Sequence, residues 1–112
     1  MKASQSSNNI RVRHIIDAIK EALSFIDGKT RIDLDTNRML VLALLKELEL
    51  IGEAASKVSP DFREKHSSIP WSLLIATRNR LVHGYFDVNL DIIWTTINQD
   101  LRGLLRIIED LG

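Results

Sequence analysis

The sequence has no cysteine, and this absence removes several kinds of chemistry at once. Without a thiol the chain can form no disulfide framework, no cysteine-based metal site and no thiol nucleophile, which suits a reducing compartment. Other metal-ligand patterns are also lacking, because the three histidines are isolated and no His-x3-His pair or carboxylate cluster occurs. We therefore predict that the protein uses no metal and no other cofactor.

Net charge and long hydrophobic runs are lacking as well. The 15 basic side chains balance the 15 acidic ones, so no overall field draws the protein onto nucleic acid. RNA binding would then need a local basic patch or a groove shared by two copies. No apolar run approaches the roughly 18 residues of a membrane span, and the N-terminus has no apolar signal core. We expect a cytoplasmic protein without membrane contact.

What the sequence does contain is an ordinary globular composition, with 45% hydrophobic and 27% charged residues in 112. This length suits one domain. Residues 1–9 are rich in Ser and Asn and have no apolar periodicity, so we predict a disordered lead-in whose Asn8 or Asn9 caps the first helix. The domain then covers residues 10–112.

Helical periodicity dominates this domain, and no strand-like alternation or internal repeat competes with it. A short helix is expected at 60–65, because Pro60 follows Ser59 and suits a first helical position. The fold class is therefore all-α, an antiparallel bundle of four long helices and one short helix. Apolar residues at spacings of three and four predict the long helices over 10–27, 36–58, 70–83 and 90–110.

The ends of these helices have recognisable signals. Gly28 is expected to end the first helix, since glycine favours the left-handed turn that follows a helix. Asp35 or Thr36 is expected to cap the second helix, and Asp87 or Asn89 the fourth.

The second helix combines an apolar seam with small residues. Gly52 and the pair 54–55 would let another helix approach closely. Glu53 either pairs with an arginine across that interface or stays solvated, as most acidic side chains do. Glu47 and its charged neighbours are expected to form the solvated face.

The most informative stretch is 78–85, which follows the apolar stripe of the third helix. Position 78 falls in the middle of that stripe, yet it holds an arginine. Either the stem of Arg78 lies on the seam while its head reaches solvent, or the guanidinium finds partners there.

His83 and Tyr85 accompany this arginine. Position 83 lies about 140° around a helix from position 78, so one helix does not aim both side chains at one point. Either unwinding at Gly84 brings His83 round, or a second copy of the chain completes the site. The second possibility predicts a homodimer with the motif helices near its two-fold axis.

Arg78, Asn79, His83 and Tyr85 together form an R-N-x3-H-x-Y pattern that resembles the signature of HepT-like proteins. These are a branch of the HEPN superfamily, small helical ribonuclease toxins that are paired with a minimal nucleotidyltransferase antitoxin. The resemblance extends over about residues 10–110 and includes the segments 50–55 (LIGEAA), 69–71 (IPW) and 84–90 (GYFDVNL).

This resemblance implies a metal-independent endoribonuclease toxin of a type II-like toxin–antitoxin pair. RNA would be its substrate, with Arg78, Asn79 and His83 catalytic. The nucleotidyltransferase would silence it by adenylylating Tyr85. The chemistry agrees, because an imidazole exchanges protons near neutral pH and a guanidinium fork suits a phosphate.

Two other interpretations remain open. The bundle could be a non-catalytic binding module that docks or regulates a nucleotidyltransferase. It could also be a structural dimer that has lost its activity, although the complete motif argues mildly against this.

Overall fold

The structure is a computed structural model that describes the backbone of residues 2–83 and 88–111 and the side chains of residues 7–79 and 88–111. Every regular element in these ranges is helical, which confirms the predicted all-α class. The elements are α1 (Lys2–Phe25), α2 (Asp33–Thr36), α3 (Arg38–Ser56), α4 (Pro60–Lys65), α5 (Trp71–His83), α6 (Leu90–Thr95), the π-helical turn η1 (Thr96–Asp100), α7 (Leu101–Ile108) and the 3₁₀ turn η2 (Glu109–Leu111).

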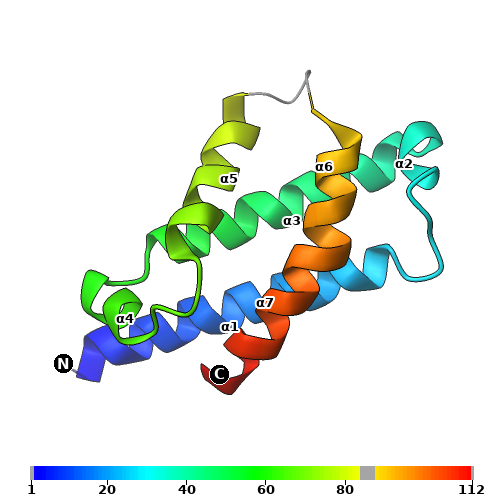
Figure 1. The fold of residues 1–112 in the computed structure, drawn as a ribbon. Helices are drawn as coiled ribbons and strands as arrows, with labels where there is room; N and C mark the ends of the chain where they lie inside the picture. The colour runs from blue at the N-terminus through cyan, green and yellow to red at the C-terminus, as the bar shows by residue number, and fades with distance from the viewer. Residues whose placement is uncertain (1, 84–87, 112) are drawn as a thin grey trace.

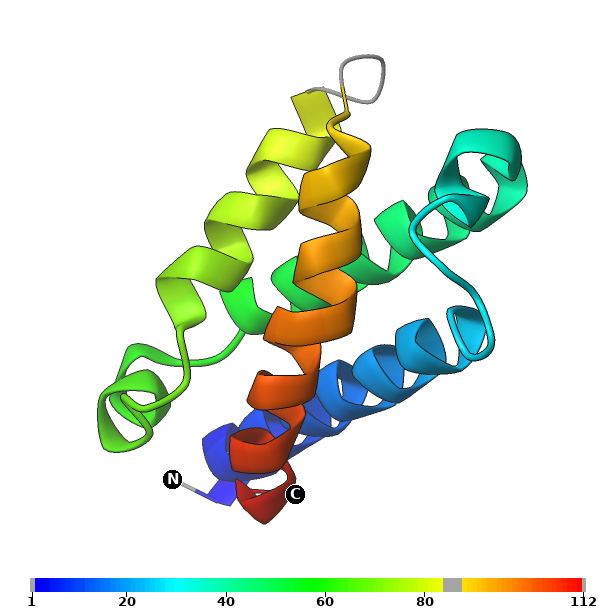
Figure 2. The same cartoon turned by 45° about the vertical axis from the view of Figure 1, so that its right-hand side comes forward.

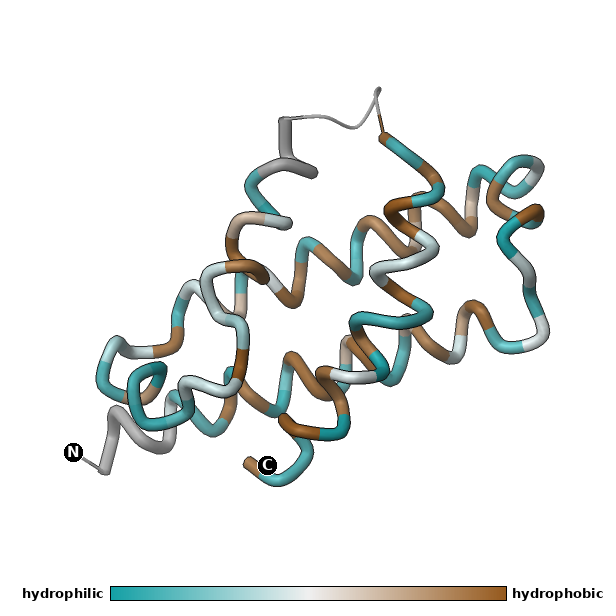
Figure 3. The backbone as a smooth tube through the Cα atoms, in the orientation of Figure 1, coloured by the Kyte–Doolittle hydropathy of each residue, from teal (hydrophilic) through white to brown (hydrophobic). Residues whose placement is uncertain are grey.

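Four long rods form the bundle, as predicted: α1, α3, α5 and the continuous run from α6 to η2 (Figure 1). α1 and α3 lie side by side, α5 packs on α3, and α7 packs on α1 (Figure 2). Hydrophobic positions recur along each rod (Figure 3), and this period of three to four residues creates the buried face. The largest fully buried side chains of the core are Val12, Ile15, Ile19, Val41, Leu44, Leu45, Ile51, Ile97, Leu101 and Ile108.

The first helix differs from its prediction at the start. α1 begins at Lys2, so it includes most of the segment that composition assigned to a disordered lead-in. Asn8 is buried in this helix rather than capping one, because its side chain has partners 51 residues away in the sequence. The amide Nδ2 donates to Ser59 Oγ at 2.9 Å, and Oδ1 accepts from Ser59 N at 3.0 Å. These two hydrogen bonds join Asn8 of α1 to the residue that caps α4.

The predicted second helix, 36–58, begins at Arg38 in the structure, and a short helix that was not predicted, α2, precedes it in the expected loop. Asn37 caps α3, since its Oδ1 accepts from Leu40 N at 3.0 Å, so the predicted cap at Asp35 or Thr36 is wrong. The carboxylate of Asp35 is used elsewhere, in an ion pair with Arg31 at 3.1 Å. Gly28 has a φ of +75° just beyond α1, which confirms its expected role at the helix end.

The remaining boundaries follow their signals. Ser59 accepts from Phe62 N at the start of α4. Asn89 Oδ1 accepts from Asp91 N at 2.9 Å and from Ile92 N at 3.2 Å, which confirms Asn89 as the cap of the last rod. Within that rod Leu101 N donates to Thr96 O, five residues back, and this contact marks the π turn.

Across residues 2–83 and 88–111, no helix combines the length and the hydropathy needed to cross a membrane.

Candidate functional site

The motif begins in α5, the helix that packs on α3. The loop before it is fixed by Trp71, which is buried and whose Nε1 donates to His66 O at 3.0 Å. Trp71 and Leu74 then face the core, and position 78 continues that face one turn later. The prediction that Arg78 occupies an apolar seam is therefore confirmed.

Gly52 of α3 is the point where the two helices meet most closely. A Cβ added to Gly52 would overlap Arg78 Cβ and would lie 2.8 Å from Leu74 O and 3.0 Å from Arg78 Cγ. Real Cβ atoms do not approach backbone atoms this closely, so only glycine fits here without a shift of the helices. The close approach expected at Gly52 is confirmed. The residue of α5 that packs against Gly52 is Arg78, the arginine of the motif.

The guanidinium of Arg78 lies at the edge of this seam. Arg78 is half-buried, and its Nη1 donates to Asn79 Oδ1 at 3.2 Å. Its Nε is buried and has no hydrogen-bond partner among the described residues. The stem therefore packs on the seam while the head keeps donors free, which combines the two predicted possibilities. A guanidinium with free donors can accept a phosphate or a carboxylate.

The other motif residues fall at the limit of the description. The backbone of His83 ends α5, as predicted, but its side chain lies outside the described residues. Gly84 and Tyr85 also lie outside them. The structure thus brings together Arg78 and Asn79, and it leaves the predicted placement of His83 and Tyr85 around them untested.

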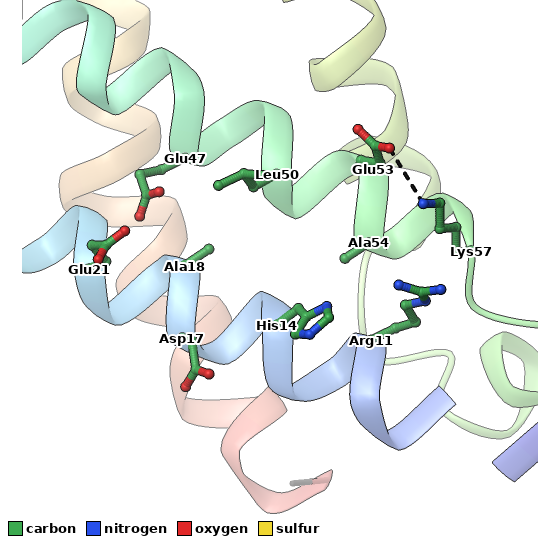
Figure 4. A pocket seen from close by; sticks show the side chains of 10 residues that line it. All are labelled: Arg11, His14, Asp17, Ala18, Glu21, Glu47, Leu50, Glu53, Ala54 and Lys57. Carbon is green, nitrogen blue, oxygen red and sulfur yellow. Dashed lines mark ion pairs between the residues drawn. The ribbon is translucent and has the colours of Figure 1, made fainter. Parts of the chain in front are cut away.

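A separate groove of about 420 Å³ lies between α1 and α3 (Figure 4). Acidic Glu21 and Glu47 lie toward one end, while Arg11 and Lys57 lie toward the other. Of the described residues that line the groove, none belongs to the motif, so it is distinct from the Arg78 seam. The lining residues are Arg11, His14, Asp17, Ala18, Glu21, Glu47, Leu50, Glu53, Ala54 and Lys57.

Glu47 was missed by sequence reasoning, because it was assigned to the solvated face. Its side chain is only 3% exposed, and Oε2 has no hydrogen-bond partner among the described residues. Burial, followed by a hydrogen bond and charge repulsion from Glu21, raises the pKa of Glu47 to about 7. Its spacing from Leu44 and Leu48 does place it beside the apolar seam, and that was the available signal. Glu53, by contrast, pairs with Lys57 of its own helix at 3.5 Å.

Metal binding has no support in this geometry. Within the residues that the structure describes, no three His, Cys, Asp or Glu side chains are placed to hold a metal ion. The Arg78 seam offers donors of hydrogen bonds, which are suited to an anion and not to a cation.

Comparison of the sequence with known protein families identifies one family that matches most of the chain. The family description "Ribonuclease HepT-like" matches residues 15–111, almost the whole domain. The chain belongs to this family. The family resemblance drawn from the motif is thereby confirmed over the bundle as well as over the motif helix.

Individual relatives agree with this assignment. The chain is 33% identical over 100 residues to a protein of Caldanaerobacter subterraneus subsp. tengcongensis that is named as a candidate RNase, and the match covers 89% of each chain. It is 32% identical to the "Probable ribonuclease HepT" of Thermococcus cleftensis, with 86% of this chain and 91% of the relative covered. No solved structure matches the chain.

Proposed function

We propose that this protein is an endoribonuclease that cleaves RNA without a metal ion, through Arg78, Asn79 and His83. The observation that carries the proposal is the Arg78 side chain of a member of the ribonuclease HepT-like family. It is held on Gly52, and its buried Nε has no partner among the side chains that the structure describes. A buried donor without a partner is costly in a folded protein, so its retention favours an anionic ligand at this place.

The three residues would divide the chemistry of phosphodiester cleavage. Cleavage without a metal needs a proton acceptor near the 2′-hydroxyl and a cation near the phosphate as negative charge grows. His83 would transfer the proton, and Arg78 would bind the phosphate with its planar fork. Asn79 would orient Arg78, as its hydrogen bond of 3.2 Å supports.

The active form is proposed to be a homodimer. Helical rotation predicts that Arg78 and His83 point to different sides of one helix, because five residues correspond to about 140°. Two motif helices near a two-fold axis would present both residue types to a common cleft. A monomer in sedimentation at micromolar concentration that cleaves RNA at full rate would contradict this arrangement.

Regulation is proposed to act on Tyr85, as the toxin of a type II-like toxin–antitoxin pair. A nucleotidyltransferase antitoxin would transfer AMP to the phenol oxygen of Tyr85 and release pyrophosphate from ATP. The added bulk and negative charge beside Arg78 would then compete with the RNA phosphate.

The decisive experiment measures RNA cleavage in excess chelator for wild type, His83→Ala and Arg78→Lys. Loss of the proton-transfer group should lower kcat by about 10²–10⁴-fold. Arg78→Lys keeps the charge but loses the fork, so we expect a lower rate with an unchanged melting temperature. A wild type stopped by chelator would disprove the metal-free mechanism. A His83→Ala variant that cuts at the wild-type rate would show that the site is elsewhere.

A variant of Tyr85 tests the proposed regulation separately from RNA cleavage. Tyr85→Phe removes only the acceptor oxygen, so cleavage should remain while labelling by the cognate transferase with ATP is lost. If the variant is still labelled, the modified residue is a different one. The alternative, a non-catalytic module that docks a nucleotidyltransferase, predicts transferase binding by a wild type that leaves RNA intact.

A further inference from the structure

We propose that Gly52 of α3 is a positioning residue for the Arg78 guanidinium. The proposal rests on the function given above, in which Arg78 binds the reacting phosphate. It adds a residue from a different helix, 26 positions earlier in the sequence, that sets where this guanidinium lies.

Two of the atoms that an added Cβ at position 52 would meet cannot rotate away from it. The atoms nearest to an added Cβ are Arg78 Cβ, Leu74 O and Arg78 Cγ, the last two at 2.8 Å and 3.0 Å. The position of a Cβ and of a carbonyl oxygen is fixed by the backbone. A methyl group at position 52 therefore requires α5 itself to move or to turn.

Among the described residues, no hydrogen bond or ion pair joins Arg78 to another helix. The hydrogen bond of its Nη1 goes to Asn79, the next residue of the same helix. Such a bond moves with α5 and fixes the head only relative to its own backbone. Nε has no partner among the described residues. Packing against Gly52 is thus the described contact that relates this side chain to α3.

Apart from this contact, a glycine inside α3 is unfavourable for the stability of the helix. It lies inside α3, four residues before the helix ends, where glycine loses more chain entropy than alanine on folding. A displacement of about 1 Å in a positioned catalytic group is enough to cost about 10²-fold in rate. The close approach at position 52 therefore sets the geometry of the site as well as the packing of two helices.

The chain offers a matched control in Gly103 of α7. This glycine is also inside a helix, but a Cβ added there meets no atom within 4 Å. Gly103→Ala should leave cleavage unchanged and should not lower the melting temperature. Gly52→Ala makes the same chemical change at the contact with Arg78.

The experiment measures kcat, KM for RNA and the melting temperature for wild type, Gly52→Ala, Gly103→Ala, Arg78→Gly and the double variant Gly52→Ala/Arg78→Gly. We expect Gly52→Ala to lower kcat by about 10²-fold with a much smaller change in KM. Against the Arg78→Gly background, the same change should lower the residual rate no further, because the residue through which it acts is absent. The melting temperature should also fall less in that background, since Arg78 Cβ and Cγ are gone.

The outcomes separate this proposal from the function on which it rests. Wild-type cleavage by Arg78→Gly would refute the role of Arg78 itself. Loss of cleavage in Arg78→Gly, together with wild-type kcat in a folded Gly52→Ala, would refute only the role of Gly52. Should Gly52→Ala not fold, the residual rate of the double variant decides. A rate equal to that of Arg78→Gly supports the proposal, whereas a lower rate or failure to fold overturns it, because position 52 would then act through Leu74 O and helix spacing and not through Arg78.

Discussion

At the scale of single residues, Glu47 is an acidic side chain that two packed helices, α1 and α3, bury almost completely. Its carboxyl group lies between α1 and α3 beside Glu21, whereas Arg11 and Lys57 lie toward the other end of the groove (Figure 4). An uncompensated carboxylate is costly to bury, so the folded protein favours the protonated form. This preference is the cause of the pKa of about 7.

The raised pKa predicts a dependence of stability on pH. Glu47 has a pKa of 4.5 as an ordinary glutamate and about 7 in the fold, so the folded state binds more protons in this window. Its contribution to the free energy of unfolding is complete below about pH 4.5 and is lost as the pH rises to about 7. Glu47→Gln should therefore gain melting temperature relative to wild type between pH 5 and pH 8.

Thermal unfolding of both proteins across this range tests the prediction. Glu64→Gln, which changes an exposed glutamate of α4, serves as the matched control and should follow the wild type. A constant difference between Glu47→Gln and wild type at every pH would show that Glu47 ionises normally in the fold.

Sequence reasoning succeeded with Arg78 and failed with Glu47 for related physical reasons. Arg78 interrupts a strong apolar stripe, so its place on the seam could be computed from helical rotation alone. Glu47 sits between charged neighbours, and only the approach of α1 determines that it is covered. Burial of that kind depends on the partner helix, which no local pattern contains.

At the scale of secondary-structure elements, the start of the last rod depends on one side chain. Asn89 Oδ1 accepts from two backbone N–H groups of α6. Asn89→Ala should lower the free energy of unfolding by about 1 kcal/mol, whereas Asn89→Asp keeps an acceptor at the cap and should stay near the wild type. Chemical denaturation of the three proteins measures this. Equal losses in both variants would mean that the cap bonds contribute nothing.

Element existence was predictable here, and element boundaries were less so. Each long rod carries a full amphipathic stripe, which is a strong and repeated signal. The start of α3 carries a weaker one, because Asp35, Thr36 and Asn37 are all good capping residues. In the structure Asn37 caps α3, and the carboxylate of Asp35 pairs with Arg31 instead.

At the scale of the whole molecule, the beginning of the chain is joined to its middle. Asn8 satisfies both the hydroxyl and the backbone N–H of Ser59, the residue that caps α4. α4 in turn precedes the loop that leads into the motif helix. The N-terminal turns of α1 are therefore part of the framework that places α5.

Removal of this connection should destabilise the bundle. Asn8→Ala removes both hydrogen bonds to the half-buried Ser59, so we expect a loss of about 1–3 kcal/mol in the free energy of unfolding. Asn9→Ala alters the exposed neighbour and should have little effect. Urea denaturation of the two variants gives the comparison. If they are equally stable, the hydrogen bonds to Ser59 are not significant in solution.

Two features could not be predicted from local sequence: the helical start of the chain within residues 1–9, and the packing of Arg78 against Gly52. Ser and Asn are poor helix formers, so residues 1–9 gave no helical signal, and the contact of Asn8 with Ser59 joins residues 51 positions apart. The seam position of Arg78 and a close helix approach at Gly52 were predicted separately, and the structure shows that the two residues meet. The relation of His83 and Tyr85 to it stays a prediction, since it depends on segments beyond the described part of α5.

The π turn at η1 also bears on how chain length can vary among relatives. A turn closed by a bond five residues back holds one residue more than an α-helical turn. A relative that lacks one residue between positions 96 and 100 would close the turn as a regular α-helix, with Ile93 and Leu101 still facing the core. A gap of one residue inside α3 would instead rotate everything beyond it by about 100°. Single-residue insertions and deletions should therefore accumulate at η1 during the divergence of the family.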